Sequence, residues 1–350
     1  MTNIPMERAE NIQAAQWPLD QSRAGSRVNA KLFGAILIAS ACASAAIASW
    51  LPLQVSIVTV FLFAGPHNWF EARYFLMRLP ARFGRSRTFF AVAFAGIFVL
   101  TIAYLSLPAL YYLNLWSGVN WAITIAGWNT ALLLWIAALI VIRGRQRARR
   151  DWSWAIPVAF ALCAVNWMAP DLFSLAIVYV HPLVALWFLD LHLRRNKPEW
   201  LGAYHRCLML LPLLLGVMLV QLARTPSLAD DNGLFWRITQ HAGAELLPNV
   251  SSHVLVSTHV FLELLHYGVW IFALPLIGAS GAIWKVNSIP LARRTRGFPK
   301  LIAAFLILGL LGVAALWTGF SINYAAMRDV YFAVAIAHVL AEAPFLLRMI

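Results

Sequence analysis

The chain has 350 residues, of which 61% are hydrophobic and 12% are charged. Soluble domains carry about 25% charged residues, so half of the usual charge is missing. This composition excludes a disordered chain, a coiled coil, a disulfide scaffold and almost all soluble enzymes. It predicts an integral membrane protein built from helices. The three cysteines lie in or beside apolar segments without ligand or pairing spacing, which is typical of small buried residues.

Apolar segments recur along the chain and predict an all-α, polytopic membrane bundle with about ten transmembrane helices. A helix needs about 20 apolar residues to cross roughly 30 Å of hydrocarbon. We expect residues 1–31 to form a cytoplasmic tail and residues 32–350 to form a single transmembrane domain. The longest predicted loop, 224–251, has room for only a short surface helix. The predicted spans are 32–50, 53–78, 88–108, 117–142, 153–168, 171–193, 206–223, 252–283, 301–319 and 329–348.

The positive charges are distributed unequally between the two ends of these spans. Of 27 Lys and Arg residues, 24 fall on one side, and only Arg224, Arg237 and Arg328 fall on the other. The positive-inside rule then predicts cytoplasmic termini and even-numbered spans that run from outside to inside. We expect a multi-pass protein of a membrane such as the bacterial inner membrane. The net charge of +13 serves orientation and contact with anionic lipid, so no nucleic-acid partner is expected.

Ionisable side chains inside the spans are costly and therefore point to function. The Asp, Glu and His residues in the apolar stretches are confined to even-numbered spans, and three of these spans repeat the spacing His-x-x-x-Glu. Residues i and i+4 share one helical face, so each pair directs an imidazole and a carboxylate the same way. The pairs are His67 and Glu71 in the second span, His259 and Glu263 in the eighth, and His338 and Glu342 in the tenth.

The depth of these residues in the membrane is also similar. Counted from the outer end of the span, one histidine falls near the middle of the membrane in four of the five even-numbered spans. The glutamate of each pair lies one turn nearer the cytoplasm. His266 extends the face of the eighth span by another turn. We therefore expect one layer of four imidazoles beside one layer of three carboxylates. The four mid-span histidines are His67, His181, His259 and His338.

Imidazole and carboxylate groups together suit iron, manganese or zinc. The absence of Cys and Met at these positions argues against copper(I). Helical bundles build di-iron centres from Glu and His on facing helices. The sequence therefore predicts one or two non-haem iron ions, with haem and zinc ranked below iron. The expected metal-binding residues are His67, Glu71, His181, His259, Glu263, His266, His338 and Glu342.

Five further polar residues are interpreted differently. Asp190 and His192 lie at the cytoplasmic end of the sixth span beside two arginines, which favours an interfacial ion-pair cluster. His205 and His241 fall in predicted loops, where we expect no functional role. His253 lies at the outer end of the eighth span, off the face that carries His259, and is left out of the site.

The run Gly65-Pro66-His67 with an acid at i+4, the mid-span histidines and the His–acid pair of the last span resemble the Brp/Blh β-carotene dioxygenase family. Members are multi-span, iron-dependent enzymes that cleave a carotenoid to retinal with membrane-embedded histidines. The resemblance covers a few short motifs. This chain is longer, has more predicted spans and has Glu where Asp is expected. The resemblance implies iron held by His67, His181, His259 and His338, and it does not extend to the carotenoid substrate.

The leading functional hypothesis is a membrane-embedded non-haem iron oxygenase or oxidase. Its expected partners are dioxygen, membrane lipid and a lipophilic small molecule such as a carotenoid, lipid or quinone. One alternative is a haem-binding membrane redox or assembly protein, which leaves the glutamates unexplained. A metal or proton transporter ranks third, because such proteins place polar groups through the whole membrane depth and often contain inverted repeats.

Overall fold

The computed structural model describes residues 29–80, 83–113, 118–147, 151–230, 233–278, 286, 289–292 and 298–350. Within these ranges the chain forms helices and no strand, which confirms the all-α class. Most of the predicted N-terminal tail, residues 1–28, lies outside the described residues. In chain order the elements are α1 (Ala30–Trp50), α2 (Pro52–Arg78), η1 (Gly84–Ser86), α3 (Arg87–Tyr112), α4 (Gly118–Gln146), α5 (Ala155–Met168), α6 (Pro170–Asn196), η2 (Pro198–Trp200), α7 (Leu201–Leu222), α8 (Gly233–His241), α9 (Ser252–Tyr267), η3 (Gly268–Ala273), α10 (Leu274–Gly278), α11 (Pro299–Ile322) and α12 (Tyr324–Met349).

Eight helices in the described part of the chain are long and apolar enough to cross a membrane. They are α1, α3, α4, α6, α7, α9 with its continuation, α11 and α12. Helices occupy the two remaining predicted spans as well. However, α5 has 14 residues and is only about 21 Å long at 1.5 Å per residue, and α2 carries polar side chains between His67 and Arg73. A multi-pass membrane protein is therefore supported, whereas the number of ten spans is not confirmed.

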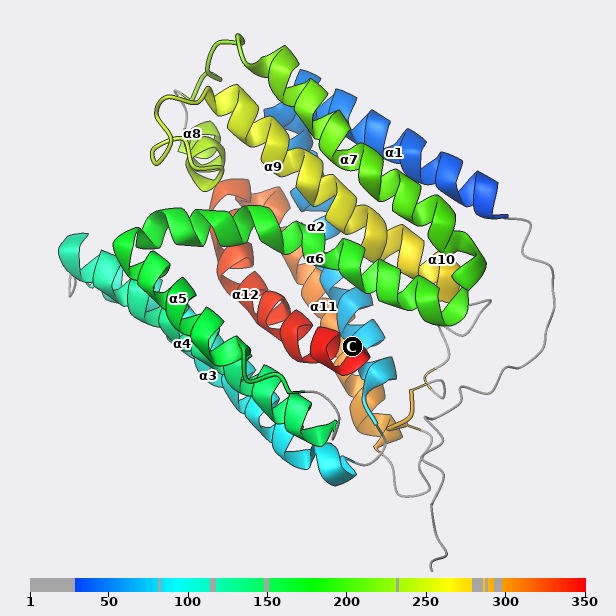
Figure 1. The fold of residues 1–350 in the computed structure, drawn as a ribbon. Helices are drawn as coiled ribbons and strands as arrows, with labels where there is room; N and C mark the ends of the chain where they lie inside the picture. The colour runs from blue at the N-terminus through cyan, green and yellow to red at the C-terminus, as the bar shows by residue number, and fades with distance from the viewer. Residues whose placement is uncertain are drawn as a thin grey trace, which may run out of the picture.

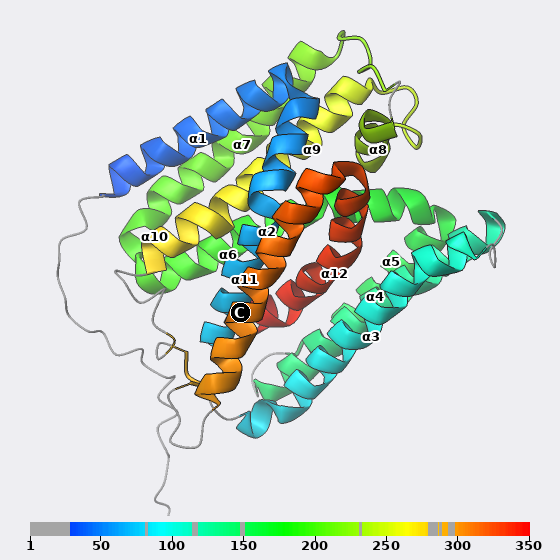
Figure 2. The same ribbon diagram turned by 180° about the vertical axis from the view of Figure 1, so that it is seen from behind.

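Two groups of helices flank the centre of the molecule. Helices α1, α7 and α9 lie side by side in one group, and α3, α4 and α5 form the other (Figures 1 and 2). Between them lie α2, α6 and α12. Helix α9 contacts α2 and α6, and α12 contacts the same two helices. The four helices that carry the predicted metal ligands therefore meet at the centre.

The first residues of these four helices are set by local sequence. The side chains of Ser251 and Asn323 accept hydrogen bonds from backbone N–H groups at the starts of α9 and α12. Pro52 and Pro170 stand at the first positions of α2 and α6. At the first position of a helix the N–H has no partner within the helix, so proline can stand there without losing a hydrogen bond. These starts determine how far along each helix a histidine lies.

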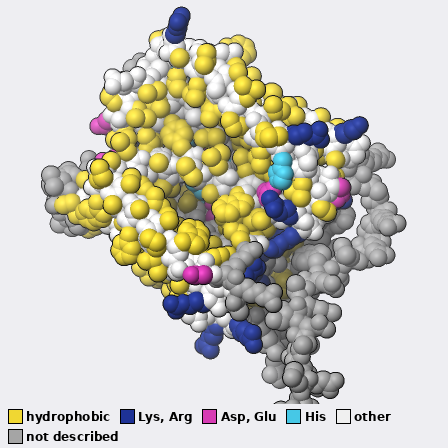
Figure 3. Space-filling model, in the orientation of Figure 1, with side chains coloured by type: hydrophobic (Ala, Val, Ile, Leu, Met, Phe, Trp, Pro, Cys, Tyr) yellow, Lys and Arg dark blue, Asp and Glu magenta, His cyan; other side chains and the backbone are white. Residues whose placement is uncertain are grey.

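The outward surface of the helices is strongly hydrophobic, as Figure 3 shows for one face. Large apolar side chains are exposed along the spans, for example Phe98 (68% exposed) on α3, Val220 (77%) on α7 and Leu308 (65%) on α11. In water, so large an apolar surface would drive association. In a bilayer the same side chains lie in hydrocarbon, so this surface is consistent with a membrane protein.

Basic side chains from α4 and α6 gather at the end of α12. Arg143 donates hydrogen bonds to the carbonyl oxygens of Leu347 (3.3 Å) and Arg348 (3.2 Å), and Arg195 donates to that of Met349. The C-terminal ends of three even-numbered predicted spans therefore lie at one end of the molecule, as the charge pattern requires. The side of the membrane that this end faces stays a prediction.

Candidate metal centre

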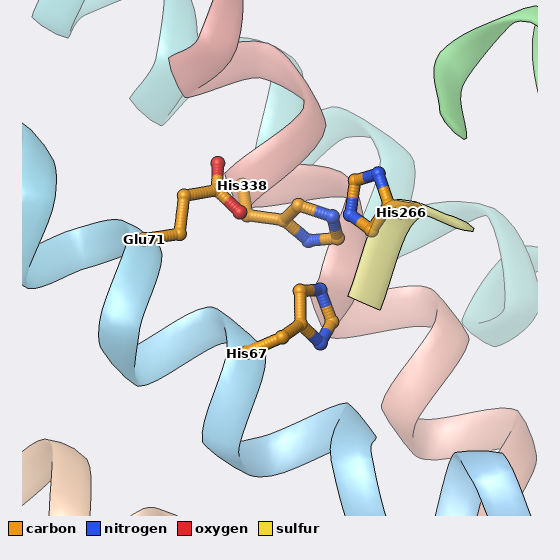
Figure 4. A group of neighbouring side chains, drawn as sticks. All are labelled: His67, Glu71, His266 and His338. Atoms are coloured by element: carbon orange, nitrogen blue, oxygen red, sulfur yellow. The ribbon is translucent and has the colours of Figure 1, made fainter. Parts of the chain in front are cut away.

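Six of the predicted ligands meet between α2, α6, α9 and α12, and we call them the histidine cluster. One ligand atom from each of His67, Glu71, His266 and His338 lies within 4.8 Å of the others. The same is true of a second group, which shares His266. Figure 4 shows the first group converging from three helices. The full cluster consists of His67, Glu71, His181, His266, His338 and Glu342.

His67 is held in one tautomer by its own helix. Its Nδ1 lies 3.1 Å from the carbonyl oxygen of Phe63, one turn earlier on α2. Because a carbonyl only accepts, Nδ1 carries the proton and Nε2 carries the lone pair. This Nε2 is buried without a hydrogen-bond partner, and the ring lies against those of His266 and His338, at centroid distances of 5.3 and 5.1 Å. Metal-binding histidines commonly donate one ring N–H to a carbonyl in this way and leave the other ring nitrogen to bind the metal.

His181 links the two groups through both ring nitrogens. Its Nδ1 lies 3.1 Å from Glu342 Oε2, and its Nε2 lies 3.3 Å from Nε2 of His338. A carboxylate that orients an imidazole is a common feature around metal ions. The separation of the two Nε2 atoms does not fit axial ligands of a haem. Two metal–imidazole bonds of about 2.0 Å on opposite faces need about 4 Å between the nitrogens.

Seven buried side-chain atoms of the cluster have no hydrogen-bond partner: one nitrogen each of His67 and His338, both nitrogens of His266, both oxygens of Glu71 and one oxygen of Glu342. Leaving a buried polar group unpaired costs about 1–3 kcal/mol. All seven atoms are of the types that bind first-row metal ions, and a cation would satisfy several of them together. The residues therefore fit one or two metal ions.

A turn of π-helix, η3, directly follows the residues of α9 that enter the cluster. Such wide turns are rare and frequently occur at functional sites. Here the turn separates two roles on one continuous helix. His266 faces the cluster before it, whereas Trp270 within it packs against Phe188 and Phe75, with ring centroids 5.3 and 5.8 Å apart.

His259 and Glu263 lie outside both groups of ligand atoms. Counted from the first residue of each observed helix, His67, His266 and His338 come 15, 14 and 14 residues later, whereas His259 comes only 7 residues later. Helix α12 begins at Tyr324 rather than at the expected 329. This shift matches His338 with His266 instead of His259. The assignment of His259 and Glu263 as metal ligands stays a prediction.

The polar residues at the basic end form a separate network. Asp190 accepts hydrogen bonds from Arg194 Nε (2.5 Å) and from His205 Nε2 (2.7 Å). His192 Nδ1 lies 3.0 Å from a guanidinium nitrogen of Arg78. None of these residues belongs to the two ligand groups. His205 was expected in a loop without a role, but it lies on α7 and pairs with Asp190, because η2 ends at residue 200 and α7 begins at once.

A cavity of about 570 Å³ opens beside the histidine cluster. This volume is within the range of small-molecule sites, roughly 300–1,000 Å³. The cluster contributes four imidazoles to the lining, and much of the remaining wall is apolar, with aliphatic side chains from α3, α4, α6 and α12 beside aromatic ones. These aliphatic residues are Leu107, Ile125, Ile177, Val178, Ile336 and Val339.

A second polar set lines the same cavity, and we call it the arginine group: His241, His259, Glu263 and Arg328. His241 was expected in a loop without a role. It is instead the last residue of α8, with its ring centroid 5.0 Å from that of His259. Burial lowers the pKa of His241 well below its ordinary value, and the charges of His259 and Arg328 act in the same direction. The sequence signal that marks Arg328 is its place on the predicted outer side, where basic residues are rare.

No protein-family model matches the chain, and neither a curated protein nor a solved structure is similar enough to match it. The resemblance to the Brp/Blh family therefore stays a prediction. The function has to be argued from the geometry and chemistry of the site.

Proposed function

We propose that the protein is a membrane-embedded non-haem iron oxygenase or oxidase that acts on a lipophilic substrate with dioxygen. The observation that carries this proposal is the convergence of four imidazoles and two carboxylates beside a cavity that the imidazoles line and whose walls are largely apolar. The donor set suits manganese and zinc as well as iron. The resemblance to an iron-dependent membrane family favours iron among the three.

The residues of the cluster divide the work of holding the metal. His67, Glu71, His266 and His338 would bind one ion, and Glu342 would orient His181 toward a second ion or toward the same one. The two carboxylates would offset the positive charge, which matters in an interior of low dielectric constant. When bound, iron would supply the activation of dioxygen.

The walls of the cavity would provide the second requirement, a dry place for the substrate. Aliphatic side chains bind a lipophilic molecule by the hydrophobic effect, and they exclude water from the metal ligands. The aromatic ring of Tyr267, which lines the cavity, lies 4.7 Å from the ring of His67. A substrate that fills the cavity would therefore come into contact with the cluster.

The deciding experiment is metal analysis with an optical spectrum on the full chain purified in detergent. We expect one or two iron ions per chain and no Soret band. His266→Gln should lose bound iron, because His266 belongs to both ligand groups. His253→Gln is the matched control, since its Nε2 lies 2.8 Å from the carbonyl oxygen of Ser49 rather than in the cluster. Full iron content in His266→Gln, a Soret band, or no bound metal would contradict the proposal.

A further inference from the structure

Arg328 is a buried cation that faces the cavity. Its residue is only 3% exposed, although it lies just four residues from the start of α12. The guanidinium carbon lies 4.6 Å from the ring centroid of Phe332, one turn later, and Nε has no hydrogen-bond partner. The Phe332 ring covers one face of the guanidinium. It does not supply an acceptor for the N–H groups at its edge.

The neighbouring carboxylates do not pair with this cation. Asp329 forms an ion pair with Arg237, and both of these side chains are partly exposed. Glu263 interacts with Arg328 electrostatically, but its Oε2 lies 3.7 Å from Nδ1 of His259 and has no hydrogen bond. Among the described residues, no carboxylate oxygen lies within 4.0 Å of the Arg328 nitrogens. Burying a guanidinium is costly unless its N–H groups find acceptors, and an anion in the cavity would supply them.

The cavity connects this cation to the histidine cluster. Arg328 and His338 are ten residues apart on α12, a rise of about 15 Å along the helix. Both residues line the same cavity, and the aliphatic side chains of Ile336 and Val339 line it as well. One end of the cavity is therefore polar: it holds the paired Arg237 and Asp329, Glu263, and the guanidinium of Arg328 with its hydrogen-bond donors. The other end offers the cluster, and much of the wall is apolar.

Resting on the proposed function, we propose that Arg328, within the arginine group, binds the anionic head, a carboxylate or a phosphate, of a single-tailed amphiphile. The guanidinium matches both anions because its N–H donors are arranged in a rigid fork. The apolar wall holds the tail and presents it, rather than the head, to the histidine cluster. An ester or alcohol head would leave Arg328 without an anion in direct contact, so a neutral amphiphile binds more weakly.

The test is equilibrium binding of three probes to the full chain in detergent: hexadecanoate, hexadecyl phosphate and methyl hexadecanoate. We expect one of the anions to bind at least about tenfold more tightly than the ester, as a charge-assisted hydrogen bond requires. The tighter of the two anions identifies the head as carboxylate or phosphate. Equal affinity for the ester and both anions would overturn the proposal.

Variants test whether Arg328 causes the preference for the anionic probes over the ester. Arg328→Gln should remove the preference for the anion, whereas Arg237→Gln, which removes an equal charge near the same cavity, should retain it. Retention of the full preference in Arg328→Gln would refute the assignment. Arg328→Lys keeps the charge and should keep a reduced preference, so it replaces Arg328→Gln if that variant does not fold.

Iron content is measured on the same samples and separates this inference from the proposed function. We expect unchanged iron in Arg328→Gln, because Arg328 is not among the cluster residues. A wild-type chain that prefers the anion but binds no iron would contradict the oxygenase and support the head-group site. A chain that binds iron without any preference for the anion would support the oxygenase and contradict the head-group site.

Discussion

The imidazoles of the histidine cluster line the same cavity as the arginine group, and each set contains His-x-x-x-Glu spacing, yet their chemistry differs. His67 and Glu71 are joined by three more imidazoles and a second carboxylate, so their surroundings favour a cation. His259 and Glu263 are joined by His241 and by the guanidinium of Arg328, so their surroundings favour an anion. The comparison teaches that a repeated spacing within a helix does not define a site. The residues that the neighbouring helices bring to it decide its charge and its donor atoms.

The largest effect on metal binding should come from removing a histidine ligand that lies on α2 or α12. His67→Ala or His338→Ala should weaken metal binding by more than about 100-fold, since even changes around the ligands cost 10–100-fold. The measurement is iron per chain after dialysis against a chelator. His205→Ala is the control, because His205 pairs with Asp190 away from the cluster. Equal iron in His67→Ala and the control would show that the cluster is not the metal site.

A smaller effect is expected for the carboxylate that orients His181. Glu342→Gln keeps the size of the side chain and an acceptor for the His181 ring but removes the charge. It should lower metal affinity by about 10–100-fold. The measurement is a competition titration with a chelator. Glu199→Gln serves as a control, because the Glu199 side chain is 58% exposed and outside the cluster. Unchanged affinity in Glu342→Gln would remove this carboxylate from the metal centre.

The pair in the arginine group sharpens the comparison. The geometry predicts that His259→Ala and Glu263→Ala keep the wild-type iron content, because neither residue is in the two ligand groups. Glu263→Ala should also bind the anionic probe more tightly, since it removes an opposing charge near Arg328. The measurements are iron analysis and probe binding on the same preparations. Loss of iron in either variant would extend the metal centre to α9 one or two turns before His266.

The smallest effect is expected near the edge of the cavity. Arg237→Gln breaks the ion pair with Asp329, which lies between partly exposed side chains. Such pairs contribute about 0–1 kcal/mol, so thermal unfolding in detergent should shift little. Asp329→Asn should give the same small shift. A large shift in both variants would mean that this pair holds α8 against α12.

Much of the fold could be predicted because it depends on local properties. All ten predicted spans contain helix, and eight helices meet the length and hydropathy of a membrane span. The first and last residues of the helices were less predictable. Helix α12 begins five residues earlier than expected, since Asn323 caps it within a segment that remains polar enough to resemble a loop. Helix α5 is too short to span roughly 30 Å on its own, in agreement with its predicted span 153–168, the shortest of the ten.

The candidate site was also predictable where it depends on local geometry within one helix. Six of the eight expected ligands meet. Four of them form the pairs His67–Glu71 and His338–Glu342, which were predictable because i and i+4 residues share a face in any α-helix, whatever surrounds it. His259 and Glu263 lie outside the two ligand groups, and their assignment as metal ligands stays a prediction. The contribution of His241 came from α8, a short helix outside the spans whose position depends on contacts with α2, α9 and α12.

The amino-acid sequence by itself determined the membrane environment, the helices and the direction of each His–Glu pair. Those properties follow from hydrophobicity and from backbone hydrogen bonds within one segment. Only the tertiary structure decided that His266 joins His67, and that Arg328 is buried beside Glu263. The shift and tilt of one helix against another depend on side-chain packing along their whole length. No single segment contains that information, so the division of one cavity into two different sites emerges only when the helices pack.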